Sequence, residues 1–289
     1  MSPSVHGTSV EALFRPGGGF FLIAGPCVLE DDALNLTVAR ELRAVNEELG
    51  IAIIFKSSFD KANRSSLSSA RGPGLEEGLR KLARVREETG LPILTDVHES
   101  YQCEPVGEVV DVLQIPAFLC RQTDLLLAAG RTGRAVNVKK GQWMAPHEMG
   151  NAVQKLRAAG AGGVAVTERG TAFGYGNLVV DMRSFTEMRE ACQAPTVFDG
   201  THSVQRPGAG AVSGGDPRHI PALVRAATAA GADALFLEVH PEPAGAPSDA
   251  TNMLRLDRLR PLLEDVLAIR QALGRPVAGD AAPGSSATR

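Results

Sequence analysis

Several features that mark specialised proteins are scarce or absent in this chain of 289 residues. Aromatic residues make up only 4%, and no apolar run reaches the roughly 18 residues that a membrane-spanning helix needs. The four cysteines stand far apart, so no paired spacing indicates a disulfide framework. These absences favour a reducing compartment, and we expect a cytoplasmic protein with no membrane partner.

The chain also lacks an excess of positive charge. It has 30 Lys and Arg residues against 33 Asp and Glu residues, which gives a formal net charge of −3. Nonspecific binding of nucleic acid needs a basic surface, so we expect no nucleic-acid partner. The first residues, Met1 to His6, have neither the basic nor the apolar region of a signal peptide. An anionic ligand would therefore have to meet a local cluster of cations.

What the chain has instead is a regular alternation of short apolar runs and helical stretches. The runs are rich in Val, Ile, Leu and Phe and do not alternate strictly with polar residues, which is typical of a parallel sheet covered by helices. The eight runs are residues 20–24, 51–55, 92–96, 112–115, 135–138, 163–167, 196–199 and 234–238. Helices are predicted at residues 31–49, 76–89, 146–159, 217–230 and 257–273.

Eight strand–helix units predict an α/β protein with a single (β/α)8 TIM barrel over residues 1–274. The alternative is a doubly wound sheet, but Gly25-Pro26-Cys27 follows the first strand where a dinucleotide-binding fold would carry Gly-x-Gly-x-x-Gly. Residues 10–14 are expected to form an extra strand, in an N-terminal β-hairpin that plugs the barrel bottom. Residues 275–289, rich in Ala, Gly, Ser and Pro, are expected to be a disordered tail.

Polar side chains follow every predicted strand. The carboxyl ends of barrel strands form the active-site face, so these side chains are expected to meet there. In chain order they are Cys27, Lys56, Lys61, Asn63, Arg64, Asp96, His98, Gln114, Lys139, Lys140, Glu168, Arg169, Asp199, His202, Ser203, Glu238 and His240. Because no strand ends in apolar residues alone, the pattern favours a catalytic barrel over a purely structural one.

One subset of these residues has the chemistry of metal ligands. The seventh, eighth and first strands become neighbours when the barrel closes, and their ends carry His202, Glu238 and Cys27, with Asp249 in the following loop. A thiolate, an imidazole and two carboxylates suit a divalent transition metal. From the residues alone, the alternative stays open that Cys27 is a small buried apolar residue and His202 a hydrogen-bonded core histidine.

A second subset is cationic. Lys139 and Arg169 end adjacent strands, while Lys56 and Lys61 lie across the predicted mouth. Such a mouth has the donors to hold two anionic groups of one small ligand. The alternative for the segment after the second strand is a solvated basic loop. Residues 206–216 have the glycines of a mobile lid, or equally of an ordinary solvated loop.

The motifs resemble those of the 3-deoxy-D-manno-octulosonate 8-phosphate synthases, also called 2-dehydro-3-deoxyphosphooctonate aldolases. The resemblance covers about residues 10–273 and keeps the order of every motif. Matching segments are residues 24–27, 55–65, 95–98, 113–119, 137–142, 167–170, 198–205 and 237–241. The segment Lys61-Ala62-Asn63-Arg64-Ser65 is the specific one, because the related heptulosonate 7-phosphate synthases typically carry Lys-Pro-Arg-Thr there.

The resemblance implies a transferase that condenses phosphoenolpyruvate with D-arabinose 5-phosphate and water and releases phosphate, for lipopolysaccharide (Kdo) biosynthesis. It also implies a homotetramer. Cys at position 27, where the metal-independent relatives typically have Asn, implies the metal-dependent class. The implied ligands are Cys27, His202, Glu238 and Asp249, and Zn²⁺, Fe²⁺ and Mn²⁺ all suit this set.

The resemblance also assigns substrate and catalytic residues. The implied substrate-binding residues are Lys139 and Arg169 for the phosphate of phosphoenolpyruvate, Lys56 and Lys61 for its carboxylate, Asn63, Arg64, Ser65 and Asp96 for the sugar phosphate, and Ser58 and Gln114. The implied catalytic residues are His202, Asp249, Glu238, Lys56 and Asp96. The general base stays open between water at the metal, Asp249 and Glu238.

Two rival functions remain at this point. One is a related synthase that uses erythrose 4-phosphate or a sialic-acid precursor, and the segment at residues 61–65 speaks against the first of these. The other is a catalytically inactive barrel that senses sugar phosphates, and the complete set of strand-end residues speaks against it.

Overall fold

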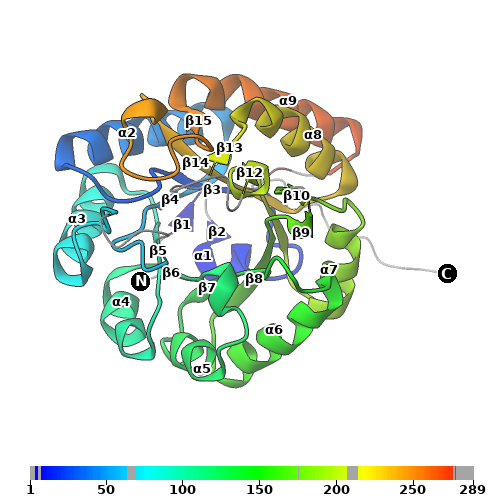
Figure 1. Cartoon of the computed structure of the whole chain (residues 1–289), viewed down its shortest axis with the longest axis horizontal. Helices are drawn as coiled ribbons and strands as arrows, with labels where there is room; N and C mark the ends of the chain where they lie inside the picture. The colour runs from blue at the N-terminus through cyan, green and yellow to red at the C-terminus, as the bar shows by residue number, and fades with distance from the viewer. Residues whose placement is uncertain are drawn as a thin grey trace.

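A computed structural model describes residues 4–5, 8–63, 69–174, 176–206, 214–275 and 277. In this part of the chain, eight parallel strands close into a barrel and helices form a ring around it (Figure 1). The predicted (β/α)8 TIM barrel is confirmed. Arg64 and Ser65, the centre of the predicted lid and nearly all of the predicted tail lie outside the described residues.

The barrel strands are buried on both faces, which explains why their sequences do not alternate. Each strand pairs with the next, and the pairs β11–β14 and β14–β3 close the ring. The strands are β3 (Phe21–Gly25), β4 (Ala52–Lys56), β5 (Ile93–Asp96), β6 (Val112–Ile115), β7 (Ala135–Lys139), β8 (Gly163–Glu168), β11 (Thr196–Asp199) and β14 (Ala234–His240).

A helix follows each barrel strand. The helices are α2 (Asp32–Leu49), α3 (Leu75–Thr89), α4 (Cys103–Val109), α5 (Thr123–Arg131), α6 (Met149–Ala158), α7 (Ser184–Cys192), α8 (Ile220–Ala230) and α9 (Leu259–Ala272). The predicted helices correspond to α2, α3, α6, α8 and α9, although the last three begin only after a 3-10 turn. The other three are 7, 9 and 9 residues long, too short for a clear helical period in the sequence. Among the helices of the described residues, none combines the length and the apolar character of a membrane span.

The barrel bottom is closed by a helix, so the strand predicted at residues 10–14 is wrong. An N-terminal β-hairpin does exist, but β1 (Ser4–Val5) and β2 (Thr8–Ser9) form it before residue 10. The helix α1 (Val10–Leu13) follows at once.

Helical spacing explains this difference. Val10, Leu13 and Phe14 recur at the i, i+3, i+4 positions of one helix face, and all three are buried in the apolar cluster that fills the barrel. The Ser9 hydroxyl caps the helix by accepting a hydrogen bond from the Ala12 N–H at 3.2 Å. Three apolar residues in a short segment suited either a strand or a helix, and packing under the barrel selected the helix.

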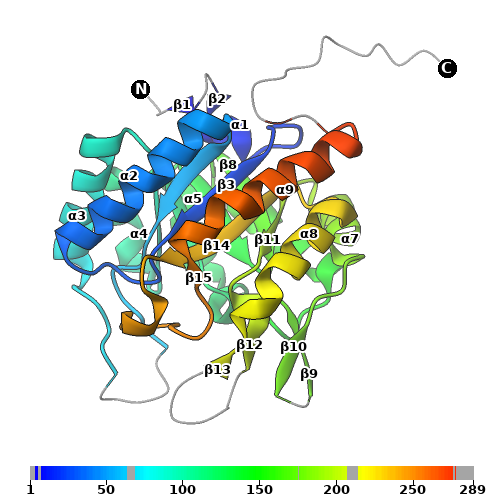
Figure 2. The same ribbon diagram turned by 90° about the horizontal axis from the view of Figure 1, so that it is seen from above.

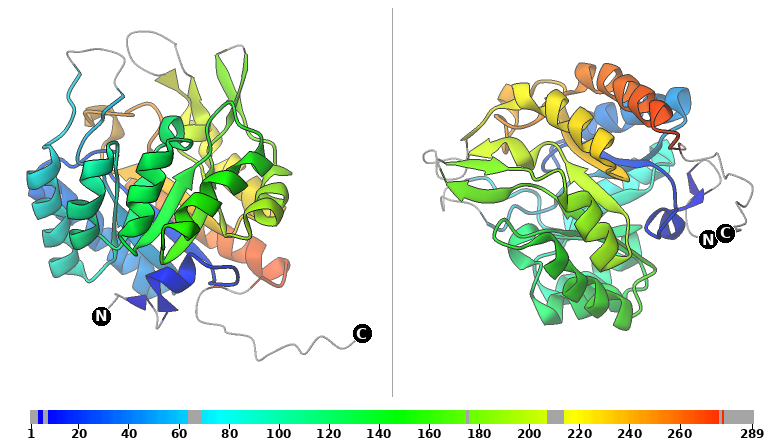
Figure 3. Two further views of the ribbon diagram at one scale, coloured as in Figure 1. Left: turned by 90° about the horizontal axis from the view of Figure 1, so that it is seen from below. Right: turned by 90° about the vertical axis from the view of Figure 1, so that its right-hand side faces the viewer.

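The two ends of the barrel differ. Figures 2 and 3 show α1 at one end and two small hairpins projecting from the opposite end. The hairpins are β9 (Thr171–Gly174) with β10 (Asn177–Val179), and β12 (Gln205–Arg206) with β13 (Gly214–Gly215). A further strand, β15 (Leu254–Arg255), extends the sheet beside β14. The end with the hairpins is where the barrel strands terminate, so it is the active-site face.

Candidate active site

A tight turn after β3 places Cys27 at the mouth. A Cβ on Gly25 would lie 2.0 Å from the backbone oxygen of Lys56, so only glycine allows this close approach to β4. The carbonyl oxygen of Cys27 accepts hydrogen bonds from Lys56 Nζ at 2.8 Å and from the Ser58 N–H at 3.3 Å. The thiol is therefore held on a fixed backbone.

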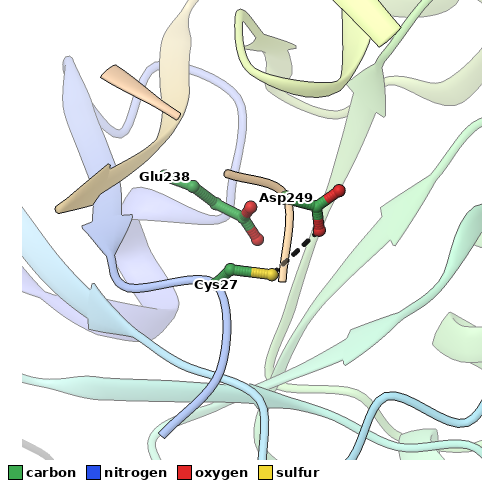
Figure 4. A group of neighbouring side chains, drawn as sticks. All are labelled: Cys27, Glu238 and Asp249. Atoms are coloured by element: carbon green, nitrogen blue, oxygen red, sulfur yellow. Dashed lines mark hydrogen bonds between the residues drawn. The ribbon is translucent and has the colours of Figure 1, made fainter. Parts of the chain in front are cut away.

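Three predicted metal ligands converge at this point (Figure 4). One donor atom from each of Cys27, Glu238 and Asp249 lies within 4.8 Å of the other two. The Cys27 thiol donates a hydrogen bond to Asp249 Oδ2 at 2.9 Å. Glu238 Oε2 is buried and has no hydrogen-bond partner among the described residues. An unsatisfied buried carboxylate oxygen beside a thiol and a second carboxylate is what a cation site requires.

His202 lies at the edge of this cluster. Its Nδ1 is 2.7 Å from Asp199 Oδ2, and its backbone N–H donates to Asp199 Oδ1 at 2.9 Å. Because an ionised carboxylate can only accept, Nδ1 carries the proton and Nε2 is left with a lone pair. Nε2 lies 3.7 Å from Glu238 Oε2. His202 thus faces the cluster in the tautomer of a metal ligand, although it is not one of the three residues that meet within 4.8 Å.

The loop that carries Asp249 holds it in an uncommon backbone conformation. Asp249 has φ = 52°, in the left-handed region. Its Oδ1 accepts hydrogen bonds from Gln205 Nε2 at 3.0 Å and from Asn252 Nδ2 at 3.3 Å. These contacts fix the side chain toward Cys27.

Two lysines neutralise the carboxylates at the mouth. Lys56 Nζ donates to Glu238 Oε1 at 2.6 Å, and both side chains are almost fully buried. Lys61 Nζ lies 3.9 Å from the same oxygen and donates to Ser58 Oγ at 3.1 Å. Lys56 is thus committed to Glu238, while Lys61 is the more accessible of the two cations.

Burial and charge together set the protonation of the cluster. Burial raises the pKa of Cys27 well above its usual value, and the charges of Asp249 and Glu238 raise it further. Burial would also raise the pKa of Glu238, but the neighbouring charges, of which Lys56 has the largest effect, outweigh burial and hold that pKa below its ordinary value. Without a cation, Cys27 is therefore a neutral thiol beside two ionised carboxylates, and a metal ion would displace its proton.

A separate cationic region includes Lys139 and Arg169. Lys139 Nζ donates to Asp199 Oδ2 at 2.6 Å and lies 3.5 Å from the centre of the Phe236 ring. Arg169 Nη2 donates to Gln205 Oε1 at 2.6 Å, but the buried Nη1 has no hydrogen-bond partner among the described residues. A buried guanidinium nitrogen without an acceptor indicates a place for an anionic ligand.

Asp96 and Gln114 lie on neighbouring strands. Asp96 Oδ2 is 3.0 Å from His98 Nε2, and its Oδ1 is buried without a partner in the described part of the chain. Gln114 Oε1 accepts a hydrogen bond from Asn137 Nδ2 at 3.0 Å. Asp96 therefore keeps one acceptor for a ligand, whereas Asn63 is exposed in its turn.

Sequence reasoning assigned no role to Gln205. Its amide oxygen accepts from Arg169 while its amide nitrogen donates to Asp249, so it joins the cationic region to the carboxylate cluster. The one available signal was its place just after the seventh strand, inside a segment quoted for the family resemblance.

Comparison with known proteins agrees with this geometry. The model of the DAHP synthetase I family matches residues 14–272. The chain belongs to the DAHP synthetase I family. Among curated relatives, a protein of Syntrophotalea carbinolica is 58% identical over 249 residues, which is 86% of this chain and 90% of the relative. One of Koribacter versatilis is 56% identical over 266 residues, 91% and 95% of the two chains. Both are named 2-dehydro-3-deoxyphosphooctonate aldolase.

Proposed function

We propose that this chain condenses phosphoenolpyruvate with D-arabinose 5-phosphate and water, and so makes 3-deoxy-D-manno-octulosonate 8-phosphate and phosphate for lipopolysaccharide biosynthesis. The curated relatives that carry the name of this activity are 53–58% identical over most of the chain. The observation that carries the proposal is Arg169 Nη1, a buried cationic donor without a partner among the described residues, in the same mouth as Lys139 and Lys61. These cations match a substrate with one phosphate and one carboxylate.

Phosphoenolpyruvate fits the two cationic regions. We place its phosphate on Arg169 and Lys139, and its carboxylate on Lys61, because Lys56 is already bonded to Glu238. Desolvation by burial lowers the pKa of Lys139 and that of Arg169, because burial destabilises their charged forms. A phosphate dianion bound beside these two groups would stabilise those charged forms. The sugar phosphate would lie further out, with a hydroxyl on Asp96 Oδ1.

The chemistry forms one carbon–carbon bond and replaces the carbon–oxygen bond to phosphate with a carbon–oxygen bond from water. The enol carbon of phosphoenolpyruvate attacks the aldehyde carbon of the sugar, whose oxygen gains a proton. Positive charge develops on the neighbouring carbon that bears the phosphate. Water adds to that carbon and loses one proton. Phosphate then leaves with the electrons of its carbon–oxygen bond, while the new hydroxyl loses its second proton and becomes the ketone carbonyl of the product. The ionised carboxylates of Glu238 and Asp249 would favour the developing positive charge and the loss of the proton from water.

We also propose that a divalent metal belongs to this site. Cys27, Glu238 and Asp249 would hold it together with His202, and Zn²⁺, Fe²⁺ and Mn²⁺ all accept this donor set. Glu238 Oε2, which has no hydrogen-bond partner in the described part of the chain, and the Nε2 lone pair of His202 support the fit. When bound, such an ion would polarise a substrate oxygen or lower the pKa of water.

The activity has a direct test. The purified protein is mixed with phosphoenolpyruvate and arabinose 5-phosphate, and released phosphate is measured; erythrose 4-phosphate replaces the sugar in a parallel assay. We expect release with arabinose 5-phosphate and at least tenfold slower release with erythrose 4-phosphate. Faster release with erythrose 4-phosphate would instead assign the heptulosonate reaction. Arg64→Ala is predicted to weaken the binding of arabinose 5-phosphate far more than the binding of phosphoenolpyruvate.

The metal has its own test in Cys27→Asn. The neutral amide oxygen is a poorer ligand than a thiolate, so affinity for Zn²⁺ should fall sharply. Chelator should abolish wild-type turnover, and Mn²⁺ should restore it. The variant should keep some chelator-resistant turnover, because Asn can hold a water by hydrogen bonding. Cys192→Ala, at a buried cysteine of α7, is the control and should keep wild-type metal dependence. Full turnover of metal-free wild-type protein would refute the proposal.

Finally, we propose that the chain assembles as a homotetramer. Phe118 and Trp143 stack with ring centres 5.9 Å apart, and each is 52% exposed. Such an exposed aromatic pair supports burial against another copy. Light scattering during gel filtration would give the mass, and a monomer at micromolar concentration would contradict assembly. The cytoplasmic location stays a prediction.

A further inference from the structure

Glu30 and His240 connect two segments that are 210 residues apart in the chain. Glu30 lies three residues after Cys27, and His240 lies two residues after Glu238 at the end of β14. Their side chains meet at 3.1 Å, between His240 Nε2 and Glu30 Oε1. His240 is 4% exposed, so water competes little for this contact.

The orientation of the imidazole is fixed by a second hydrogen bond. The backbone N–H of Glu242 donates to His240 Nδ1 at 2.9 Å. Nδ1 must therefore be the unprotonated nitrogen, and Nε2 carries the hydrogen that is donated to Glu30.

Both ends of this contact are anchored. Glu30 is tied to α2, because its backbone N–H and C=O are hydrogen-bonded to the Asn35 side chain at 3.2 Å each. His240 stands at the base of the loop that carries Asp249. The loop leaves through Glu242, which is bonded to the imidazole, and returns through β15, where Arg255 pairs with His240.

We propose that the Glu30–His240 hydrogen bond is a latch that sets the distance between the Cys27 turn and the Asp249 loop, so that Glu30 and His240 are positioning residues for a metal ion. This inference rests on the metal site of the proposed function. The two segments are also joined by the Cys27 thiol hydrogen bond to Asp249, but a metal ion would displace that proton. The latch uses none of the ligand atoms and therefore persists when a metal is bound.

Cobalt(II) binding to the metal-free protein tests the latch, because thiolate-to-cobalt absorption reports the Cys27 bond without any turnover. Glu30→Leu and His240→Phe remove the hydrogen bond while keeping most of the volume. Each substitution should lower the affinity for cobalt(II) about tenfold, which is the lower end of the effect seen for residues that orient metal ligands. Glu30→Gln keeps an acceptor oxygen for Nε2–H and should restore affinity to within about threefold of wild type.

A control at the other end of β14 separates positioning from general stability. Asp233 precedes β14 and accepts hydrogen bonds from Arg189 Nε at 3.1 Å and from the Thr196 N–H at 2.9 Å. Asp233→Asn should lower the melting temperature while leaving the cobalt(II) affinity and spectrum unchanged. Wild-type affinity in both Glu30→Leu and His240→Phe would overturn the latch, as would an equal loss in Asp233→Asn. A wild-type protein without the thiolate band would overturn the metal site and the latch with it.

Discussion

Buried cations at the mouth differ in whether their donors are used. Lys56 donates to Glu238 and to the carbonyl oxygen of Cys27, so its ammonium is satisfied within the fold. Arg169 is 6% exposed and leaves Nη1 without an acceptor among the described residues. A buried donor without an acceptor destabilises the fold, and a bound anion would remove this cost by accepting the hydrogen bond. Arg169 is therefore the residue through which ligand binding is best tested.

Arg169→Lys should raise the KM for phosphoenolpyruvate at least tenfold, a loss of roughly 1.4 kcal/mol. One ammonium cannot reach both Gln205 and a phosphate in the way that the planar guanidinium does. The KM for arabinose 5-phosphate should stay within about twofold in the same steady-state assay. Arg183→Lys, an exposed arginine paired with Asp181, should change neither value. Equal increases for both substrates would show that Arg169 does not hold phosphoenolpyruvate.

The Asp96–His98 pair makes stability depend on pH. Burial alone would lower the pKa of His98, but its hydrogen bond and ion pair with Asp96 raise that pKa above the ordinary value. The stabilisation is therefore complete below the unfolded pKa of about 6.5 and is lost as the pH rises through the folded pKa. His98→Gln should cost about 2 kcal/mol at pH 6 and less at pH 9, measured by urea unfolding. A cost that grows with pH would contradict this assignment.

At the scale of one element, single residues define the two ends of the helix α2. The Asp31 side chain accepts a hydrogen bond from the Leu34 N–H at 2.8 Å and begins the helix. Gly50 ends it with φ = 65°, and a Cβ there would meet no atom within 4 Å. A substitution at Gly50 would therefore act through backbone conformation alone.

Gly50→Ala should lower the free energy of unfolding by about 1 kcal/mol, the cost of a left-handed conformation for an L-residue. Gly50→Asn should cost less, because asparagine tolerates this conformation better. Urea unfolding of the two variants beside wild type measures the difference. Equal costs would mean that the loss arises elsewhere than in the backbone angle.

At the scale of the whole molecule, the two barrel ends have separate tasks. The bottom is packed by α1 and Phe14, whose ring is stacked on Phe21 at 5.0 Å. The mouth gathers buried charges, and several of their atoms have no partner in the described part of the chain. Stability and chemistry are therefore expected to respond to different mutations.

Phe14→Ala should destabilise the barrel by about 3–5 kcal/mol, because it leaves a cavity in a fully buried cluster. Below the unfolding transition, the KM values for both substrates should stay within about twofold of wild type. Thermal unfolding and steady-state kinetics on one preparation give both quantities. A large change in KM without loss of stability would show that the two ends are coupled.

The sequence predicted the barrel because strand and helix patterns are local. Apolar runs mark strands that are buried on both faces, and a glycine such as Gly50 marks the end of a helix. Closure of the ring then predicted that Cys27 and Glu238 would be neighbours, since β14 pairs with β3. The segment at residues 10–14 failed because its three apolar residues suit either a strand or a helix, and contacts under the barrel decide between them.

Only the tertiary structure decided which charged side chains pair with each other and which are left to bind a ligand. The sequence could not show that Lys56 is committed to Glu238, that Gln205 joins Arg169 to Asp249, or that Glu30 reaches His240. Each of these contacts joins residues at least 36 positions apart, and its geometry depends on side-chain directions at several strand ends. The sequence by itself determined the kinds of residue at the mouth and their order around the ring. Distances of 2.6–3.1 Å between them required the closed barrel, because hydrogen bonds and ion pairs depend on separations that sequence patterns do not specify.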